Sequence, residues 1–156
     1  GTRVVPQLLK AVHTGEEWEE FERSNSIPKL ELNPETLEAV RQGLWMVVNR
    51  EGTGTAARIQ GRDVIGKSGT AQVVSLAGRA SVEDSNMDFR DHGWFVFAAP
   101  RNNPEIAGVI FAEHAEQGSV GAPIAKHLIE TYFAKKEGMP LPQLEPSTAS
   151  QFSGVR

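Results

Sequence analysis

A lysine beside a serine, in a stretch interrupted by glycines, is the first place in this sequence where residue types and spacing could carry chemistry. Residues 61–68 read Gly-Arg-Asp-Val-Ile-Gly-Lys-Ser, which satisfies the pattern of a phosphate-binding loop. Such a loop opens a helix, so that its backbone N–H groups hold phosphates. Val64 and Ile65 are stiff β-branched residues where that loop must turn, and Gly-Thr-Ala-Gln-Val-Val after Ser68 favours a strand. A P-loop nucleotide-binding module that uses Gly61 to Ser68 is therefore the weaker of two interpretations.

The same lysine fits a second pattern, Lys-Ser/Thr-Gly on a β-strand, through Lys67, Ser68 and Gly69. On an extended strand the lysine presents a fixed cation, neighbouring hydroxyls can bind a carboxylate, and a strand N–H can point at a developing oxyanion. Glycine allows the substrate and the facing element to approach the backbone closely. The longer stretch Gly-Lys-Ser-Gly-Thr-Ala-Gln-Val at residues 66–73 is more specific than the tripeptide and favours acyl-transfer chemistry.

A nucleophile for such chemistry is harder to find. One Ser-x-x-Lys motif occurs, from Ser26 to Lys29, and no Ser-x-Asn motif occurs. The serine of a catalytic Ser-x-x-Lys opens a well-packed helix, so that the lysine one turn later meets its hydroxyl. Pro28 and the acidic residues of the preceding stretch contradict that arrangement. We therefore expect Ser26 to have no catalytic role.

The composition argues against several classes of function. The 156 residues carry 16 basic and 20 acidic side chains, a net charge of -4, and the charges form no basic face for nucleic acid. There is no cysteine for disulfides or thiolate metal sites, and no apolar run approaches the roughly 20 residues that span a bilayer. The histidines show no spacing that would gather three metal ligands: His13, His92, His114 and His127. We expect no metal and no cofactor.

Two helices are predicted near the lysine strand. Asn33 can cap, and Pro34 can begin, a helix that continues to about Asn49. Its apolar stripe is Leu37, Val40, Leu44 and Val47. The apolar stripe of a second helix, which follows residues 118–119, is Val120, Ile124, Leu128 and Tyr132. We expect both stripes to face a core.

Three segments predict the sheet. Residues 63–76 have the β-branched content of a strand, and residues 94–99 and 106–112 are uniformly apolar, which is typical of central strands covered on both faces. Turn-forming residues at 100–104 join the last two segments into an antiparallel hairpin. The acidic residues 15–28 are expected to form a solvated excursion.

The order helix, strand, hairpin, helix predicts an α+β fold, with helices packed on an antiparallel sheet of at least three strands. Trp45, Trp94 and Phe97 are expected to fill its core. Residues 78–91 are polar and are expected to be a mobile connection. Residues 138–156 are rich in Pro, Ser and Gln with little to bury, and they are expected to form a disordered tail.

The sequence resembles the class B penicillin-binding proteins, especially the elongation-specific type usually called penicillin-binding protein 2. The similarity extends over nearly all of the chain before the tail, into the helix that ends near Phe133. The matching segments are Arg-Val-Val-Pro-Gln-Leu-Leu-Lys at 3–10, Gly-Leu-Trp-Met-Val-Val-Asn at 43–49, Gly-Thr-Ala at 54–56, Lys-Ser-Gly-Thr-Ala-Gln at 67–72 and Asp-His-Gly-Trp-Phe at 91–95.

The resemblance implies a β-lactamase/transpeptidase-like fold, with residues 1–137 forming the C-terminal part of a transpeptidase domain that begins upstream. It implies a serine-type D-alanyl-D-alanine transpeptidase that cross-links peptidoglycan at the periplasmic face of the bacterial inner membrane and is acylated by β-lactams. A β-lactamase or a penicillin sensor of the same fold is an alternative. Lys67 and Thr70 would be catalytic, the latter through its backbone N–H, and Ser68, Gly69 and Thr70 would bind the substrate.

The resemblance also implies partners. Its nucleophile lies in a Ser-x-x-Lys motif, followed by a Ser-x-Asn motif, both well before the lysine strand. We therefore expect an upstream part of the same domain to supply them and this chain alone to be inactive. Peptidoglycan stem peptides, β-lactams, a membrane glycosyltransferase and elongation-complex proteins are the other partners that the family implies.

Overall fold

The computed structural model describes residues 7–21, 31–73 and 89–143, and the chain divides into two compact units, Gly1–Ala39 and Val40–Arg156. The Ser-x-x-Lys motif from Ser26 to Lys29 lies outside the described residues, as do most of the polar connection and of the expected tail.

The first unit contains a short hairpin. Strands β1 (Ala11–His13) and β2 (Trp18–Glu20) pair antiparallel, and the Thr14 N–H donates to the Glu17 carbonyl at 3.0 Å. The sequence predicts a solvated excursion over residues 15–28, and its described part, residues 15–21, is exposed and contains β2. The sequence pattern missed this strand because neither of its faces is buried, so polar and apolar residues do not alternate as in a half-buried strand.

Helix α1 (Pro34–Asn49) begins and ends where the sequence predicts. The Asn33 Oδ1 atom accepts hydrogen bonds from the N–H groups of Glu35 at 2.8 Å and Thr36 at 3.4 Å, which is the expected N-cap. The predicted apolar stripe is partly wrong, because Val40 is 55% exposed and the fully buried residue of α1 is Val48. Only the last turns of α1 reach the core, so a stripe drawn along the whole helix overstates its burial.

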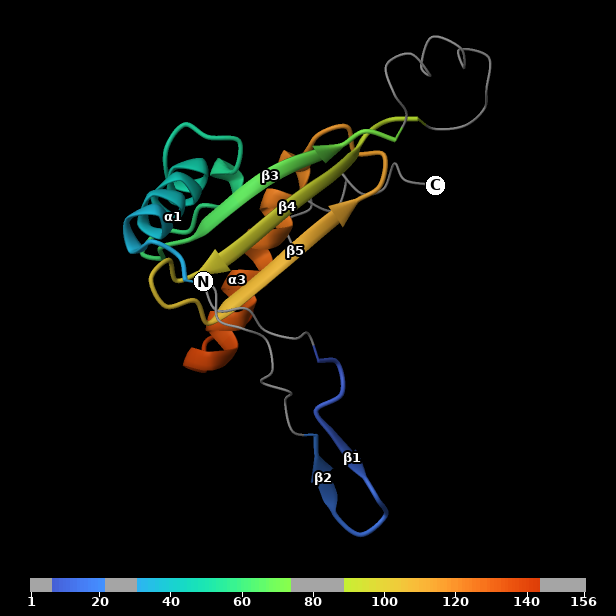
Figure 1. Cartoon of the computed structure of the whole chain (residues 1–156). Coiled ribbons are helices and arrows are strands. Elements are labelled where there is room, and N and C mark those ends of the chain that lie inside the picture. Colours follow the sequence, from blue (N-terminus) through green and yellow to red (C-terminus); the bar gives the residue numbers. More distant parts are fainter. Residues whose placement is uncertain (1–6, 22–30, 74–88, 144–156) are drawn as a thin grey trace. The chain divides into compact units, whose positions relative to one another are not determined.

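Three antiparallel strands form the sheet of the second unit in the order β3-β4-β5 (Figure 1). They are β3 (Ile65–Ala71), β4 (His92–Ala99) and β5 (Ile106–Ala112). Both the strand at the lysine and the hairpin are confirmed. Strand β3 is shorter than the range predicted for it, residues 63–76.

The prediction that β4 and β5 are covered on both faces is wrong for the described residues. Burial alternates along β4, where Phe95, Phe97 and Ala99 are buried. The residues between them, and their neighbours on β5, form an apolar face that is substantially exposed: Trp94 (40%), Val96 (45%), Val109 (54%) and Phe111 (44%). Trp94 is therefore not a core residue here, whereas Phe97 is. We call these four residues the bare face of the sheet.

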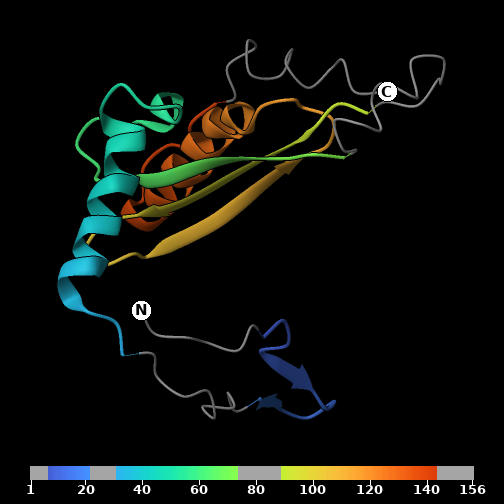
Figure 2. The same cartoon turned by 45° about the horizontal axis from the view of Figure 1, so that its top comes forward.

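The opposite face of the sheet is covered by the short helix η2 (Gly118–Gly121) and by α3 (Ala122–Glu137), which lies along the sheet in Figure 2. The buried residues of α3 are Ala122, Ala125, Ile129 and Phe133. The predicted stripe, which includes Leu128 at 42% exposure, is thus wrong by one position. Apolar residues occupy two adjacent stripes of this helix, so their spacing alone does not show which stripe faces the sheet.

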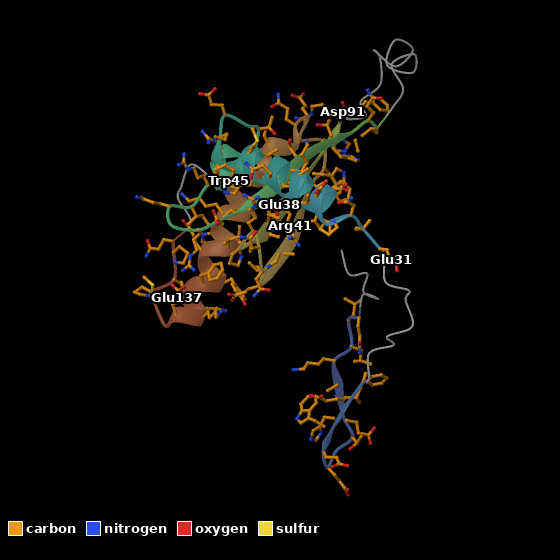
Figure 3. All side chains as sticks on the ribbon, turned by 60° about the vertical axis from the view of Figure 1, so that its left-hand side comes forward. Glu31, Glu38, Arg41, Trp45, Asp91 and Glu137 are labelled. Atoms are coloured by element: carbon orange, nitrogen blue, oxygen red, sulfur yellow. The ribbon has the colours of Figure 1, made fainter. Side chains whose placement is uncertain are left out.

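Side chains tie the helix ends to the start of β3 and to the hairpin. Trp45 Nε1 donates to Asp63 Oδ1 at 3.2 Å, and Arg62 pairs with Glu137 at 2.5 Å (Trp45 and Glu137 are labelled in Figure 3). Lys136, in the last turn of α3, pairs with Glu105 beside the hairpin turn. Hydrogen bonding to that carboxylate raises the pKa of Lys136 above its ordinary value.

Candidate active site on strand β3

Strand β3 presents the predicted site residues on an edge of the sheet. One edge of β3 pairs with β4, and no described strand lies against its other edge. Residues directly opposite each other in antiparallel strands share a face. Lys67 is opposite Val96, so the lysine lies on the bare face and is exposed. Ser68 is opposite the buried Phe95, so its side chain lies on the helix-covered face and is half-buried.

The four predicted site residues are consecutive in the strand, which brings a cation, two hydroxyls and backbone N–H groups within one short segment. Lys67 Nζ donates a hydrogen bond to the Ser68 carbonyl at 2.6 Å, so the ammonium lies close to the strand. Gly69 and Thr70 are exposed. An exposed strand edge with these groups can bind an extended, carboxylate-bearing acyl donor and stabilise negative charge on its carbonyl oxygen.

A threonine that the sequence did not single out completes the surroundings of Ser68. Thr53 Oγ1 lies 2.7 Å from Ser68 Oγ, a normal hydroxyl–hydroxyl hydrogen bond. Residues 51–55 are identifiable from sequence as a polar, glycine-rich loop, but nothing in their pattern indicates which strand residue the loop contacts. The contact spans 15 positions of sequence and depends on how α1 packs against the sheet.

The helix-covered side supports the strand at Gly69 without any intervening side chain. A Cβ atom on Gly118 would lie 2.2 Å from the Gly69 carbonyl oxygen and 2.7 Å from the Gly69 nitrogen. A Cβ on Gly93, which pairs with Thr70, would lie 2.6 Å from the Gln117 carbonyl oxygen. Backbone therefore packs directly on backbone behind the predicted substrate-binding residues, which fixes the position of this part of β3.

The phosphate-binding interpretation of residues 61–68 is wrong. Ser68 lies in the middle of a strand, and no helix begins there. Gly66 is needed for a different reason, because its Cβ would lie 2.9 Å from the Val96 carbonyl oxygen in the neighbouring strand. No set of N–H groups at a helix N-terminus is available to hold phosphates at this position.

The described segments contain neither a metal-ligand cluster nor a membrane-spanning helix. Within residues 7–21, 31–73 and 89–143, no three His, Cys, Asp or Glu side chains lie close enough to hold a metal ion. His92 has a structural contact instead, since its Nδ1 accepts a hydrogen bond from the His114 N–H at 3.1 Å. None of the described helices is long and apolar enough to cross a membrane.

A hollow of about 840 Å³ lies at the other end of β3 and does not include residues 67–70. Arg62 is one of its lining residues, and its guanidinium already lies 3.9 Å above the Phe133 ring and pairs with Glu137. This hollow therefore offers no free cation at Arg62 for a ligand.

Comparison with known proteins identifies the family. The model of the penicillin binding protein transpeptidase domain matches residues 1–130. The chain is 34% identical over 147 residues to the peptidoglycan D,D-transpeptidase MrdA of Haemophilus influenzae, with 90% of this chain and 22% of that protein covered. It is 31% identical over 144 residues to MrdA of Acinetobacter baumannii, with 90% and 21% covered. The chain thus spans about a fifth of the length of these curated relatives.

Solved structures agree. The chain superimposes on Pseudomonas aeruginosa PBP2 in complex with WCK 5153 with a TM-score of 0.60 and 30% identity, covering 84% of this chain and 26% of that one. It superimposes on Mycobacterium tuberculosis PBP3 complexed with aztreonam with a TM-score of 0.62 and 25% identity, covering 90% and 33%. The expected α+β architecture is confirmed. The chain belongs to the transpeptidase domain family of the class B penicillin-binding proteins.

Proposed function

We propose that this chain is the part of a peptidoglycan D,D-transpeptidase that supplies the lysine strand, within residues 1–137, and that a segment outside the chain supplies the nucleophilic serine. The observation that carries this proposal is the position of Lys67, Ser68, Gly69 and Thr70 along an open strand edge. The relatives named D,D-transpeptidases and the family match support the same chemistry. The segment from residue 138 onward is proposed to lie outside the catalytic domain.

In the proposed acylation step, a serine hydroxyl attacks the carbonyl carbon between the two terminal D-alanine residues of a stem peptide. The serine–acyl ester bond forms, the peptide C–N bond breaks, and the serine proton leaves with the amine of the terminal D-alanine. The Thr70 N–H donates to the oxyanion, a type of contact whose loss costs on the order of a hundred- to a thousandfold in rate. The amine nitrogen of a second stem peptide then attacks the ester carbonyl. The new peptide C–N bond forms, the ester bond to the serine breaks, and the amine proton returns to the serine oxygen.

The hydroxyls of Ser68 and Thr70 are proposed to bind the terminal carboxylate of the donor, which β-lactams also carry. Lys67 is proposed to add a fixed positive charge that attracts that carboxylate and orients the polar groups of the facing segment. A cation close to its partner in a site that excludes water is worth far more than the same pair in bulk water. Solved relatives complexed with aztreonam and with ampicillin support β-lactams as ligands of this site.

The bare face supports the proposal that another segment of the domain completes this chain. Its four residues on β4 and β5 form a contiguous apolar surface next to Lys67. A face of this kind normally packs against a further layer.

Helicobacter pylori PBP2 has been solved in complex with MreC, which supports elongation-complex proteins as further partners at the periplasmic face of the inner membrane. A membrane glycosyltransferase is proposed as another partner.

The test is covalent labelling of the full-length protein by a fluorescent penicillin. Lys67→Ala is expected to lower the second-order rate of labelling by about a hundredfold or more, because the carboxylate loses its charged partner at the reacting site. Lys126→Ala is the matched control, since that lysine lies on α3 and pairs with Glu130 at 3.9 Å. Equal labelling of the Lys67→Ala protein and its parent would contradict the proposal, as would labelling of the 156-residue chain alone.

A further inference from the structure

The loop after α1 is held against the sheet by two glycines. The Gly54 N–H donates to the Val47 carbonyl at 3.0 Å, and a Cβ on Gly52 would lie 2.4 Å from that same oxygen. A Cβ on Gly54 would lie 3.1 Å from the ring of Phe95. Backbone at both positions is thus in close contact with α1 or with the core. Thr53, between the two glycines, is fixed at the level of Phe95, which is opposite Ser68 in the sheet.

The contact that results is a hydrogen bond between two hydroxyls, Thr53 Oγ1 and Ser68 Oγ, at 2.7 Å. Each hydroxyl has one hydrogen to donate and two lone pairs to accept with. If Ser68 donates to Thr53, its only hydrogen is used and none is left for a substrate. If Thr53 donates, the Ser68 hydrogen stays available and is made a stronger donor by cooperative polarisation. A carboxylate can only accept, so a bound carboxylate selects the second arrangement.

The residue type at position 68 gives this contact a further role. Threonine at this place in a Lys-Ser/Thr-Gly strand would have two substituents on Cβ that restrict χ1, whereas serine has one and rotates among its staggered rotamers more freely. Ser68 therefore needs an outside group to hold its hydroxyl in one direction. In the described part of the chain, Thr53 is the side chain hydrogen-bonded to that hydroxyl.

We propose that Thr53 is a positioning residue for substrate binding. It donates its hydroxyl hydrogen to Ser68 Oγ, fixes the Ser68 rotamer, and directs the Ser68 hydrogen toward the carboxylate of the acyl donor. This inference rests on the proposed function, because it gives Ser68 a carboxylate to bind. Thr53 itself does not touch the donor in this arrangement.

The test compares two acyl donors that differ only in that carboxylate: benzylpenicillin and its methyl ester. Rates of covalent adduct formation are measured by mass spectrometry on the full-length protein and on its Thr53→Val, Thr53→Ser and Thr55→Val variants. Thr53→Val keeps the side-chain shape but removes the hydroxyl, and Thr53→Ser keeps the hydroxyl. Thr55→Val is the control, two residues further along, at the start of the short helix η1 (Thr55–Ala57).

Thr53→Val is expected to lower the acylation rate by benzylpenicillin about fivefold to tenfold, the loss of one hydrogen bond that supports a charged ligand. The rate with the methyl ester is expected to stay within about twofold of the parent, because the ester has no charged group for Ser68 to bind. Thr53→Ser is expected to restore the benzylpenicillin rate. Adding Ser68→Thr to Thr53→Val is expected to recover part of it, because the threonine hydroxyl is held by its own backbone conformation.

Four results would overturn the proposal. An unchanged benzylpenicillin rate in Thr53→Val would show that the hydroxyl is not used. Equal losses with acid and ester, or a Thr53→Val protein that fails to fold, would show that Thr53 is only structural. A parent that neither penicillin acylates would instead refute the proposed function, and the role of Thr53 with it, so the two failures are distinguishable.

Discussion

The two glycines of strand β3, Gly66 and Gly69, differ in how closely other atoms approach them. Substitutions at the two positions can therefore distinguish an effect on stability from an effect on acylation. A Cβ on Gly66 would lie 2.9 Å from the Val96 carbonyl oxygen and 3.0 Å from the Phe95 ring. A Cβ on Gly69 would meet nothing closer than Trp94 Cβ, at 3.6 Å, which is an ordinary contact. Within the described residues, the fold therefore requires glycine at position 66 and has room for alanine at position 69.

Gly69→Ala is expected to leave the free energy of unfolding of the full-length protein within about 0.5 kcal/mol of the parent. It is expected to slow penicillin acylation on the order of a hundredfold, because the methyl group would lie on the same face of β3 as Lys67 and displace the acyl donor there by about 1 Å. Chemical denaturation and fluorescent-penicillin labelling measure the two effects.

Gly66→Ala is the matched comparison, and it is expected to cost about 1–3 kcal/mol of stability, since the neighbouring backbone must shift to admit the methyl group. A Gly69→Ala protein that loses comparable stability, or that is acylated at the parent rate, would contradict this division of roles.

At the scale of residues, the sequence predicted the strand that carries the candidate site but not the residues that contact this strand from other segments. Lys67 to Thr70 were identifiable because the motif is local and its strand context is visible in the neighbouring β-branched residues. Thr53 and Gly118 contact that strand from 15 and about 50 positions away. Such contacts depend on tertiary packing, which no local pattern contains.

The elements are joined at one corner of the fold, where the end of α1 meets the start of β3. Asn49 Nδ2 donates both to the Val64 carbonyl at 2.8 Å and to the Trp45 carbonyl at 3.0 Å. One side chain thus satisfies the last turn of α1 and the residue just before the strand. This connection sets the direction in which the loop with Thr53 leaves the helix.

Asn49→Ala is expected to lower the free energy of unfolding of the full-length protein by about 1–3 kcal/mol, because two partly buried carbonyls lose their donor. Thermal or denaturant unfolding measures the loss. Asn103→Ala, in the exposed turn of the hairpin, is the control and is expected to change stability by less than about 0.5 kcal/mol. Equal effects of the two substitutions would show that the corner is not held by Asn49.

At the scale of elements, the sequence predicted type and order well and burial less well. The N-cap and proline fixed the start of α1, and the turn residues between β4 and β5 indicated a hairpin. The predicted stripe of α3 was wrong by one position, because apolar residues occupy two adjacent stripes of that helix and spacing alone does not select between them. The uniform apolarity of β4 and β5 predicts strands covered on both faces, whereas the described residues cover only one face.

The uniform apolarity of β4 and β5 is explained by burial in the whole molecule and not by packing within this chain. A strand is apolar on both sides when both sides are buried in the complete protein. The bare face, with Trp94 and Val96 on β4 and Val109 and Phe111 on β5, is consistent with a second layer supplied from outside the described residues. This chain covers about a fifth of the length of its relatives, and the remaining sequence of such a protein can supply that layer.

The bare face makes a prediction that compares the isolated chain with the full-length protein. The isolated 156-residue chain is expected to bind the hydrophobic dye ANS, and Val96→Thr with Val109→Thr is expected to reduce that binding, since these two valines are opposite each other on the face. Val40→Thr is the matched control, because Val40 is similarly exposed but lies on α1. An equal reduction in the control would show that the dye does not report on the sheet.

In the full-length protein the same two substitutions are expected to change stability rather than ANS binding. ANS is not expected to bind to the bare face of the full-length protein, because a second layer covers it. Each hydroxyl introduced there is expected to lower the free energy of unfolding by about 1–3 kcal/mol, because it is buried without a hydrogen-bond partner. Denaturant unfolding of the full-length parent and of the double variant measures this cost. If the double variant is as stable as its parent, the face is open to water in the complete protein, and the apolar residues of β4 and β5 then need another explanation.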